Sequence, residues 1–385
     1  GEVCSSISDT YREKKNMVTL INTSDVLEGR VLNHERVPNS NLKGQFKKTF
    51  QRDDILYSEI RPQNRRFAYV DFSPIDYIAS TKLMVIRAKK DVVSPKYLYY
   101  FLKNSSTVAE LQLLAETRSG TFPQITFSEV ANLTIPVPSL AVQEVIVQTM
   151  QCLEDKITCN EQINDNLEQQ AQAIYHERFE TVSPNDLPSE WRIVTLGEVA
   201  TISNKSFNPL KEPEILLEHY SIPAFDEARF PVFELSTSIK SNKFIIDASC
   251  FMISKLNPTT KRVWKPYCLT GNAVCSTEFI VYKAKDKTIT DFLYSVIDSN
   301  SFSDFMCSHV TGSTGSRQRT TPSDTLSYEL ILPSEDDLAE FQSLVSPMYA
   351  QIRINAIEND RLKRLRDSLL PKLMSGEIDV STIQL

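Results

Sequence analysis

The sequence predicts an α/β (α+β) protein of two globular modules, each followed by a long helix, with the two long helices forming an antiparallel coiled coil. Two observations lead to this fold. Residues 138–179 and 333–374 carry apolar residues at intervals of three and four, the pattern of one apolar stripe on a helix. The chain also repeats itself at a distance of about 195 residues, so each module and each helix occurs twice. An antiparallel helix pair would relate the modules by a pseudo-two-fold axis.

The long helices need a partner along their length. At about 1.5 Å per residue, some 40 residues make a rod of roughly 60 Å, which exceeds one small globular core. Asn160 and Asn164 align with Asn355 and Asn359, and a matched Asn layer inside an apolar seam fixes the register of a coiled coil. Two ordinary amphipathic helices, each packed on its own module, are the alternative. The residues expected in the stripes are Ile146, Met150, Leu153, Ile157, Ile163, Leu167, Ala171 and Ile174, then Phe341, Leu344, Met348, Ile352, Leu362, Leu365, Leu369 and Leu373.

The repeat sets the expected domain boundaries. Gly1-Glu2-Val3 matches Gly197-Glu198-Val199, so the chain begins a few residues into its first repeat. Pro184 and Pro188 mark a linker between the copies. We expect a first module over 1–137, a first long helix over 138–182, a linker over 183–190, a second module over 191–333, a second long helix over 334–376 and a tail over 377–385.

Within each module the same elements are expected in the same order. Runs rich in β-branched and aromatic residues predict strands in 55–68 and 80–89 and in their twins, 250–264 and 276–285. A helix follows, with apolar residues at 97–102 and 292–297. A polar loop, 118–130 or 313–325, then leads to a final strand, 133–139 or 328–334.

Composition places the chain among globular proteins without a membrane segment. Hydrophobic residues make up 41% and charged residues 24%. No apolar run reaches membrane length and no signal peptide is visible. The seven Cys form no CxxC pair and the four His show no ligand spacing, so we expect reduced thiols in a cytoplasmic protein and no metal site.

The charge distribution leaves nucleic acid open as a partner. The formal net charge of −7 argues against a polyanion at first. However, residues 1–130 hold 19 Lys and Arg against 15 Asp and Glu, whereas residues 139–182 hold 2 against 8. The acidity therefore falls on the long helix, and the modules could still meet DNA.

No catalytic motif stands out. The sequence has no GxxxxGK phosphate loop, no HExxH and no GxSxG, and it lacks the motifs of a nucleic-acid methyltransferase. We therefore predict no catalytic residue and no cofactor in this chain.

The predicted DNA-binding residues lie in two polar loops of each module. Arg and Lys side chains reach guanine edges or phosphates, and Asn and Gln side chains bond adenine edges. Any single one of them could equally be a solvated turn residue, but both loops recur in both copies. Lys43, Lys47, Lys48 and Arg52 form a further basic cluster, either facing phosphates or solvated. The predicted site residues are Arg61, Gln63, Asn64, Arg65, Arg66, Arg118 and Gln124, and in the second copy Asn257, Thr259, Thr260, Lys261, Arg262, Arg317, Gln318 and Arg319.

The chain resembles the specificity subunit of type I restriction-modification systems. The resemblance rests on residues 121–127 (TFPQITF), the run from Ile135 to Pro138, Gln143 with Ile146, and residues 365–378 (LRDSLLPKLMSGEI). It implies that each module is a target recognition domain for one half of an asymmetric, bipartite site in double-stranded DNA. It also implies that the helices are a ruler and a platform for two methyltransferase subunits, which carry S-adenosylmethionine. Restriction subunits using ATP and Mg would join, and the specificity subunit itself would have no chemistry.

Two other functions remain open from the residues alone. One is a nuclease or modification enzyme with fused DNA-recognition domains, which metal-dependent cleavage by the isolated chain would reveal. The other is a scaffold that binds only proteins through its coiled coil. Such a scaffold would show no salt-sensitive DNA binding, whereas phosphate contacts make binding steeply salt-dependent.

Overall fold

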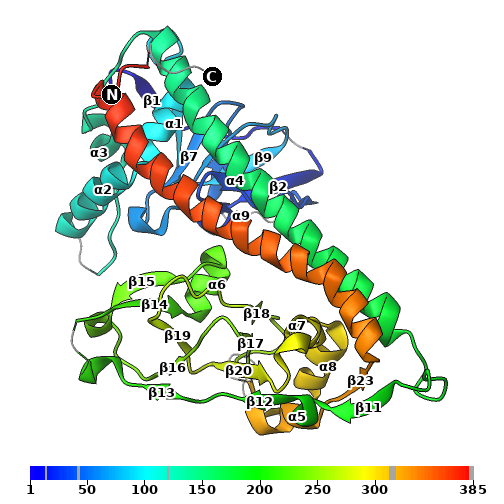
Figure 1. Cartoon of the computed structure of the whole chain (residues 1–385). Helices are drawn as coiled ribbons and strands as arrows, with labels where there is room; N and C mark the ends of the chain where they lie inside the picture. Colours follow the sequence, from blue (N-terminus) through cyan, green and yellow to red (C-terminus); the bar gives the residue numbers. More distant parts are fainter. Residues whose placement is uncertain (14, 41–43, 119–120, 213, 312–317, 381–385) are drawn as a thin grey trace. The chain divides into compact units, whose positions relative to one another are not determined.

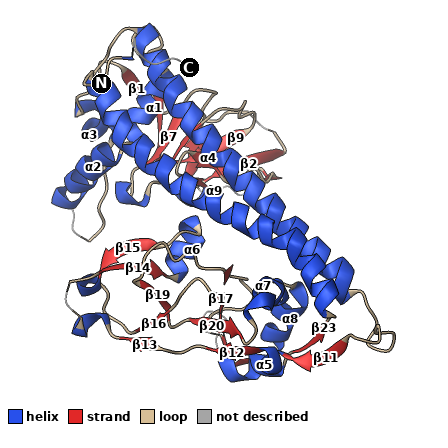
Figure 2. Ribbon diagram, viewed as in Figure 1, coloured by secondary structure: helices blue, strands red, loops and turns tan. Residues whose placement is uncertain are grey.

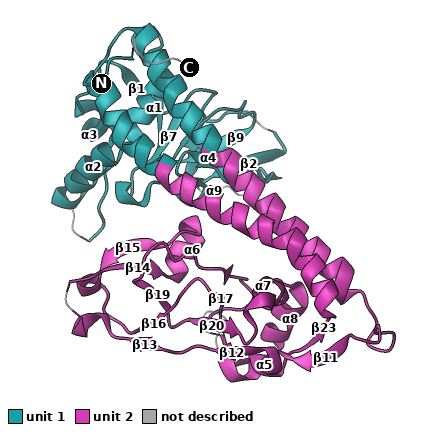
Figure 3. Ribbon diagram, viewed as in Figure 1, with its two compact units in different colours: residues 1–156, 362–385 teal, residues 157–361 magenta. Residues whose placement is uncertain are grey.

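The computed structural model describes residues 1–13, 15–40, 44–118, 121–212, 214–311 and 318–380. The chain forms two compact units, coloured separately in Figure 3. Unit 1 consists of residues 1–156 and 362–385, and unit 2 of residues 157–361. The long helices α4 (Leu140–Tyr175) and α9 (Glu335–Ser375) each contribute to both units, so this division cuts across the predicted helices.

Unit 1 is built on two four-stranded sheets and three short helices (Figure 1). In the main sheet all neighbouring strands are antiparallel. In the second sheet the central pair is parallel, and the other pairs are antiparallel. The main sheet has the order β1 (Cys4–Ile7), β10 (Leu83–Ala88), β7 (Ile55–Ser58), β8 (Phe67–Tyr69); the second has the order β5 (Val37–Pro38), β2 (Met17–Ile21), β9 (Tyr77–Ser80), β6 (Phe46–Lys48). A small hairpin joins β3 (Val26–Leu27) to β4 (Arg30–Val31), and the helices are α1 (Pro95–Lys103), α2 (Ser105–Arg118) and α3 (Phe127–Asn132).

Unit 2 repeats this plan (Figure 2), as the internal repeat predicts. Its main sheet has the order β12 (Ala200–Ile202), β20 (Phe279–Ala284), β17 (Cys250–Ser254), β18 (Val263–Trp264). Its second sheet has five strands: β13 (Ser206–Phe207), β16 (Lys243–Ile245), β19 (Ala273–Ser276), β14 (Leu216–Tyr220) and β15 (Val232–Leu235). Two small sheets pair β11 (Arg192–Thr195) with β23 (Glu329–Leu332) and β21 (Val310–Thr311) with β22 (Arg319–Thr320), and the short helices are α5 (Leu196–Val199), α6 (Ile222–Ala228), α7 (Thr290–Ile297) and α8 (Asn300–Ser308).

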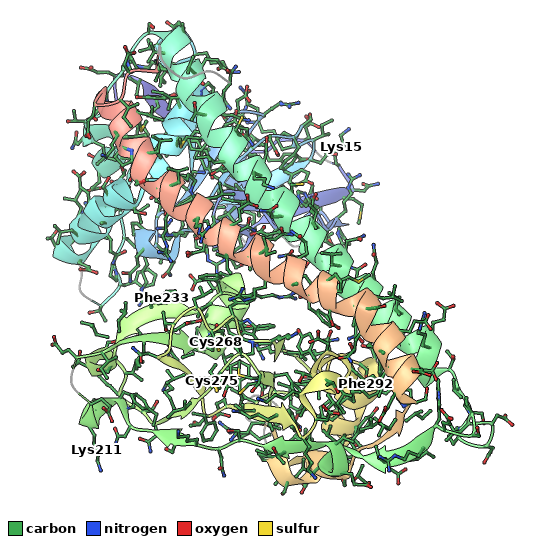
Figure 4. All side chains as sticks on the ribbon, in the orientation of Figure 1. Lys15, Lys211, Phe233, Cys268, Cys275 and Phe292 are labelled. Carbon is green, nitrogen blue, oxygen red and sulfur yellow. The ribbon has the colours of Figure 1, made fainter. Side chains whose placement is uncertain are left out.

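Each unit buries the apolar face of its first helix after the main sheet against the long helices. In unit 1, Tyr97 and Leu98 of α1 share a core with Met150 of α4 and Leu373 of α9. In unit 2, Phe292 of α7 lies among the aromatic rings of Tyr175, Phe179 and Phe341. Figure 4 labels Phe292 at this junction. The predicted helices at 97–102 and 292–297 are confirmed, and burial of aromatic rings explains why they dock there.

The predicted Asn layer is present inside unit 2, where α4 and α9 run antiparallel. Asn160 donates a side-chain hydrogen bond to Asn359 (2.9 Å), and Asn355 donates one to Asn164 (2.8 Å). Asn160, Asn355 and Asn359 are all at most 6% exposed. Buried amides tolerate only the register in which they face one another, so this layer fixes the alignment of the two helices.

Part of the predicted apolar stripe is wrong. Ile163, Leu344 and Leu365 are 40%, 40% and 48% exposed. In α9 the buried positions run through Phe341, Val345 and Tyr349, so Leu344 lies one residue outside the seam. Near the end of α9 the buried leucines are Leu370 and Leu373, and Leu365 lies outside them. Leucines on both sides of a seam satisfy the spacing rule, and only the partner helix decides which row is covered.

Element boundaries also differ from those expected. The first long helix begins at Leu140, and after Tyr175 it continues as a π-helical turn over His176–Glu180. The predicted polar loop 118–130 is shorter, because Arg118 ends α2 and α3 begins at Phe127. The final strand is confirmed in unit 2 as β23 but is wrong for 133–139. β23 pairs with β11 in unit 2, whereas residues 133–139 form no strand among the described residues of unit 1. Over the residues described, no helix is long and apolar enough to cross a membrane.

Candidate nucleic-acid interface

The first predicted loop leaves its strand through the same hydrogen-bonded turn in both units. Ser58 Oγ accepts from the Ile60 main-chain N–H and donates to the Ile60 carbonyl, and Ser254 does the same with Leu256. The next residue is left-handed in each case, with φ 45° at Arg61 and 49° at Asn257. This conformation is uncommon for residues other than Gly, so its recurrence marks a backbone geometry common to both copies.

The second predicted loop lies against the first in each unit. In unit 1, Ile60 bridges to Gln124, and the Arg61 N–H donates to the Pro123 carbonyl at 3.1 Å. In unit 2, Leu256 bridges to Arg319, and the Asn257 N–H donates to the Gln318 carbonyl at 2.9 Å. The structure therefore brings the two predicted loops of each unit together. We call each pair of loops a loop pair, defined by its described residues: 61–66 with 118 and 121–124 in unit 1, and 257–262 with 318–319 in unit 2.

Three cations of the unit 1 loop pair bond to the protein itself. Arg65 donates to Ser105 Oγ (3.0 Å) and lies 3.9 Å from Glu28. Arg66 donates to the main-chain carbonyl of Ser24 at 3.0 Å. Arg118 forms a 2.7 Å ion pair with Glu129. Their charges help to hold the loop pair on its scaffold.

Of the other four predicted site residues in unit 1, one side chain forms a hydrogen bond within the protein and three are exposed. Gln124 accepts a hydrogen bond from Lys82 Nζ at 3.1 Å. Arg61, Gln63 and Asn64 are exposed, and their side chains make no hydrogen bond among the described residues. The polar groups of these three side chains therefore face solvent.

In unit 2 the long cations are held more tightly. Arg262 forms a two-pronged ion pair with Asp226 (2.5 and 2.9 Å), and Lys261 pairs with Asp298 at 3.0 Å. Burial raises the pKa of Asp298, and the Lys261 ammonium opposes this rise. Arg319 forms a two-pronged pair with Glu278, at 3.0 Å for both contacts, which raises the pKa of the guanidinium.

Smaller polar residues are exposed beside these pairs. Thr259 and Thr260 are exposed, and Gln318 is partly exposed. The Oδ1 atom of Asn257 is buried and has no hydrogen-bond partner among the described residues. Arg317 lies outside the described residues, as do Ser119, Gly120 and residues 313–316 of the predicted loops.

Several exposed cations lie beside the second sheet of each unit, and of these only Lys47 and Arg52 belong to the basic cluster predicted from the sequence. Hydrogen bonds from the Tyr11 N–H to the Lys47 carbonyl and from the Thr49 N–H to the Asp9 carbonyl bring the segments around Arg12 and Lys47 together. In unit 2 the Ile245 N–H donates to the Lys205 carbonyl. Figure 4 labels Lys15 and Lys211 at the margins of their units. Seven exposed cations near the second sheets form no ion pair within the described ranges. They are called the flanking cations below: Arg12, Lys15, Lys47 and Arg52 in unit 1, and Lys205, Lys211 and Lys240 in unit 2.

The predicted basic cluster is therefore only partly right. Lys47 and Arg52 are exposed. Lys48 points inward and donates to the carbonyls of Thr81 (3.0 Å) and Leu83 (2.7 Å), and burial lowers the pKa of its ammonium. Lys43 lies outside the described residues. The alternation of side chains along β6 could have separated Lys47 from Lys48. Within the described part of the chain, no group of three His, Cys, Asp or Glu side chains could hold a metal ion.

Comparisons with known proteins point to one family. Residues 1–169 match the model of the type I restriction modification DNA specificity domain. The type I restriction enzyme HindI specificity subunit of Haemophilus influenzae is 28% identical, over 94% of this chain and 94% of its own. The type I restriction enzyme MjaIX specificity subunit of Methanocaldococcus jannaschii is 25% identical, over 81% of this chain and 77% of its own.

Solved structures share the fold. The S subunit of a type I restriction-modification system from M. genitalium matches with a TM-score of 0.53 and 16% identity, over 97% of this chain and 94% of its own. A chain from a study of assembly and conformational transition of the type I R-M system matches with a TM-score of 0.50 and 19% identity, over 98% and 97%. At these identities the likeness concerns the fold alone.

Proposed function

We propose that this chain, which belongs to the specificity subunits of type I restriction-modification systems, reads an asymmetric, bipartite site in double-stranded DNA. The observation that carries the proposal is the loop pair. Both units build it from the same serine turn, a left-handed residue at the same position and an equivalent bridge between the loops. The side chains it presents differ between the units, as two different half-sites require.

The exposed polar side chains are the proposed base-reading residues. In unit 1 these are Arg61, Gln63 and Asn64, since Arg bonds guanine and Asn or Gln bonds adenine in the major groove. In unit 2 they are Thr259, Thr260 and Gln318. The paired cations Arg262 and Arg319 support the loops and do not need to leave their carboxylates for reading to occur.

The flanking cations are proposed to contact phosphates. Phosphate contacts fix the position of a protein on a duplex but carry no sequence information. Exposed Lys and Arg side chains without a carboxylate partner suit this role, because binding DNA costs them no ion pair. The two sets of flanking cations would each orient one loop pair over its half-site.

The remaining roles follow from the family. The modules 1–137 and 191–333 would be the two target recognition domains, and the helices at 138–182 and 334–376 would set the distance between half-sites. The segment 183–190 would link the two halves, and 377–385 would be a C-terminal tail. Two methyltransferase subunits carrying S-adenosylmethionine would bind along the helices, and restriction subunits using ATP and Mg would join them. In this assembly the chain would be a non-catalytic subunit of a cytoplasmic complex.

A methylome tests the proposal directly. The chain is expressed with its methyltransferase subunit in a host free of adenine methylation, and modified adenines are read by long-read sequencing. We expect one asymmetric motif of two half-sites with a fixed gap. An assembled complex that modifies no motif would contradict the proposal. Cleavage or methylation by the isolated chain would instead indicate an enzyme.

The flanking cations predict a specific change in salt dependence. Changing Lys205, Lys211 and Lys240 to Gln should lower the slope of log affinity against log salt by about 0.9 for each lost phosphate contact, or nearly 3 in total. The recognised motif should stay the same. Fluorescence anisotropy between low and moderate salt measures the slope. Lys287, an exposed residue in a 3-10 turn (Lys287–Ile289) beside the main sheet, is the matched control, and its change to Gln should leave the slope as in the unchanged chain.

A further inference from the structure

In each unit, a short turn leads from the second sheet into a central strand of the main sheet. One side chain of this turn contacts the loop pair and has been given no role so far. In unit 1 this residue is Lys82, between β9 and β10, and in unit 2 it is Glu278, between β19 and β20. Both main-chain N–H groups are capped by the serine two residues before, Ser80 and Ser276. The main-chain carbonyls of Lys82 and Glu278 accept hydrogen bonds from the N–H groups of Glu59 and Lys255, respectively. The two turns are therefore equivalent in backbone and position.

The side chains on these equivalent turns have opposite charges. Lys82 donates to Gln124 at 3.1 Å and lies 3.6 Å from Glu59. Glu278 accepts both prongs of Arg319 at 3.0 Å. The residue of unit 2 equivalent to Glu59 is Lys255, so the charge at this position is also reversed between the units. In both units a side-chain hydrogen bond thus joins the turn to the second loop. The turn residue is the donor in unit 1 and the acceptor in unit 2.

We infer that Glu278 and Lys82 are positioning residues for DNA reading, each fixing the second loop of its own unit against the first. This inference rests on the proposed function and assigns Arg319 and Gln124 to the link and not to the bases. Gln124 and Arg319 each form the main-chain bridge to the first loop, so moving either side chain would move the loop's contact with the first loop. The inverted charges make each link specific to its unit, since Arg319 placed opposite Lys82 would set two like charges together.

A charge exchange tests the inference in the complex with the methyltransferase subunit. The motif found for the unchanged chain supplies duplexes in which one half-site is intact and the other is scrambled. Glu278→Lys and Arg319→Glu should each weaken binding to the second half-site by about fivefold, as expected for a well-aligned exposed pair. The double variant restores an ion pair, with the polarity that unit 1 uses. It should recover binding to within about twofold. Binding to the first half-site should not change in any of the three.

Three results would overturn the inference. If Arg319 itself contacts DNA, the double variant will bind as weakly as Arg319→Glu. If Glu278 merely masks a DNA-binding arginine, Glu278→Gln will tighten binding to the second half-site. If the link is only structural, the melting temperature will fall and binding to both half-sites will weaken together. Lys82→Met provides the reciprocal control, with weaker binding to the first half-site alone.

The outcome separates this inference from the proposed function. An unchanged complex that yields no split motif contradicts the proposed function itself. A split motif combined with no recovery in the double variant contradicts only the positioning role of Glu278.

Discussion

Changing Glu218 to Ala should strongly destabilise the second sheet of unit 2 and weaken recognition of the second half-site. Glu218 lies on β14 and is fully buried. Its carboxylate accepts from the Tyr220 hydroxyl (2.5 Å) and from the main-chain N–H groups of Leu269 (3.0 Å) and Thr270 (2.7 Å). The Tyr220 hydroxyl in turn accepts from two further main-chain N–H groups, those of Tyr267 and Cys268. The Glu218 carboxylate thus accepts hydrogen bonds, directly or through Tyr220, from the main-chain N–H groups of residues 267–270, a loop without regular secondary structure.

The expected loss is large because the donors stay buried when their acceptor is removed. Each unsatisfied buried donor costs about 1 to 3 kcal/mol, so we expect the free energy of unfolding of unit 2 to fall by about 3 to 5 kcal/mol. Gln at this position should also destabilise the unit, because its amide would point a donor at other donors. Urea denaturation measures the loss, and hydrogen exchange at 267–270 locates it.

A neighbouring carboxylate gives the matched control. Glu234 lies on the adjacent strand β15, is 32% exposed and bonds His219 at 2.6 Å. Its change to Ala should cost less than about 1 kcal/mol, as for other partly exposed pairs. Equal stability losses at Glu218 and Glu234 would show that the buried carboxylate does not organise the loop. Binding to the first half-site should survive in the Glu218 variant, because its loop pair belongs to unit 1.

The repeat explains why so much of the fold could be predicted from sequence. Ser58 and Ser254 match in the sequence, and their hydroxyls make the same two main-chain bonds. The Asn residues of the long helices could be aligned for the same reason, since a buried amide needs its counterpart. The strand expected at 133–139 fails because a strand also needs a neighbour. Residues 329–332 pair with β11, whereas no strand pairs with the similar apolar run 133–139 among the described residues of unit 1.

The candidate site was predictable in its loops but not in its electrostatics. Arg and Lys residues in a turn are visible in the sequence, and both loops of each copy do come together. Their partners are not visible, because Asp226, Glu278 and Asp298 each lie about 36 to 41 residues from the cation they bind. Composition alone therefore does not show that Arg262 and Arg319 are paired with carboxylates, or that Lys15 and Lys205 are exposed without such a pair among the described residues. Burial and pairing, which depend on tertiary contacts, decide which cations remain available.

Removing one heptad from both long helices should shorten the gap in the recognised DNA motif by about three base pairs. The matched segments are 155–161 of α4 and 358–364 of α9, which lie at the division between the two units. Seven residues correspond to about 10 Å of helix, and base pairs follow one another every 3.4 Å or so. The deletion removes Asn160 together with its partner Asn359 and keeps the Asn164–Asn355 bond.

The choice of seven residues keeps the helices in register. A heptad departs from two whole turns by only about 20°, so the apolar seam continues across the junction and each loop pair keeps its orientation to within that angle. Both half-sites should therefore be read as before, and the methylome of the variant complex reports the gap. Duplicating the same two segments should lengthen the gap by an equal amount, which controls for a general loss of stability. Methylation of the original motif with its original gap by either variant would mean that the distance between half-sites is not set by these helices.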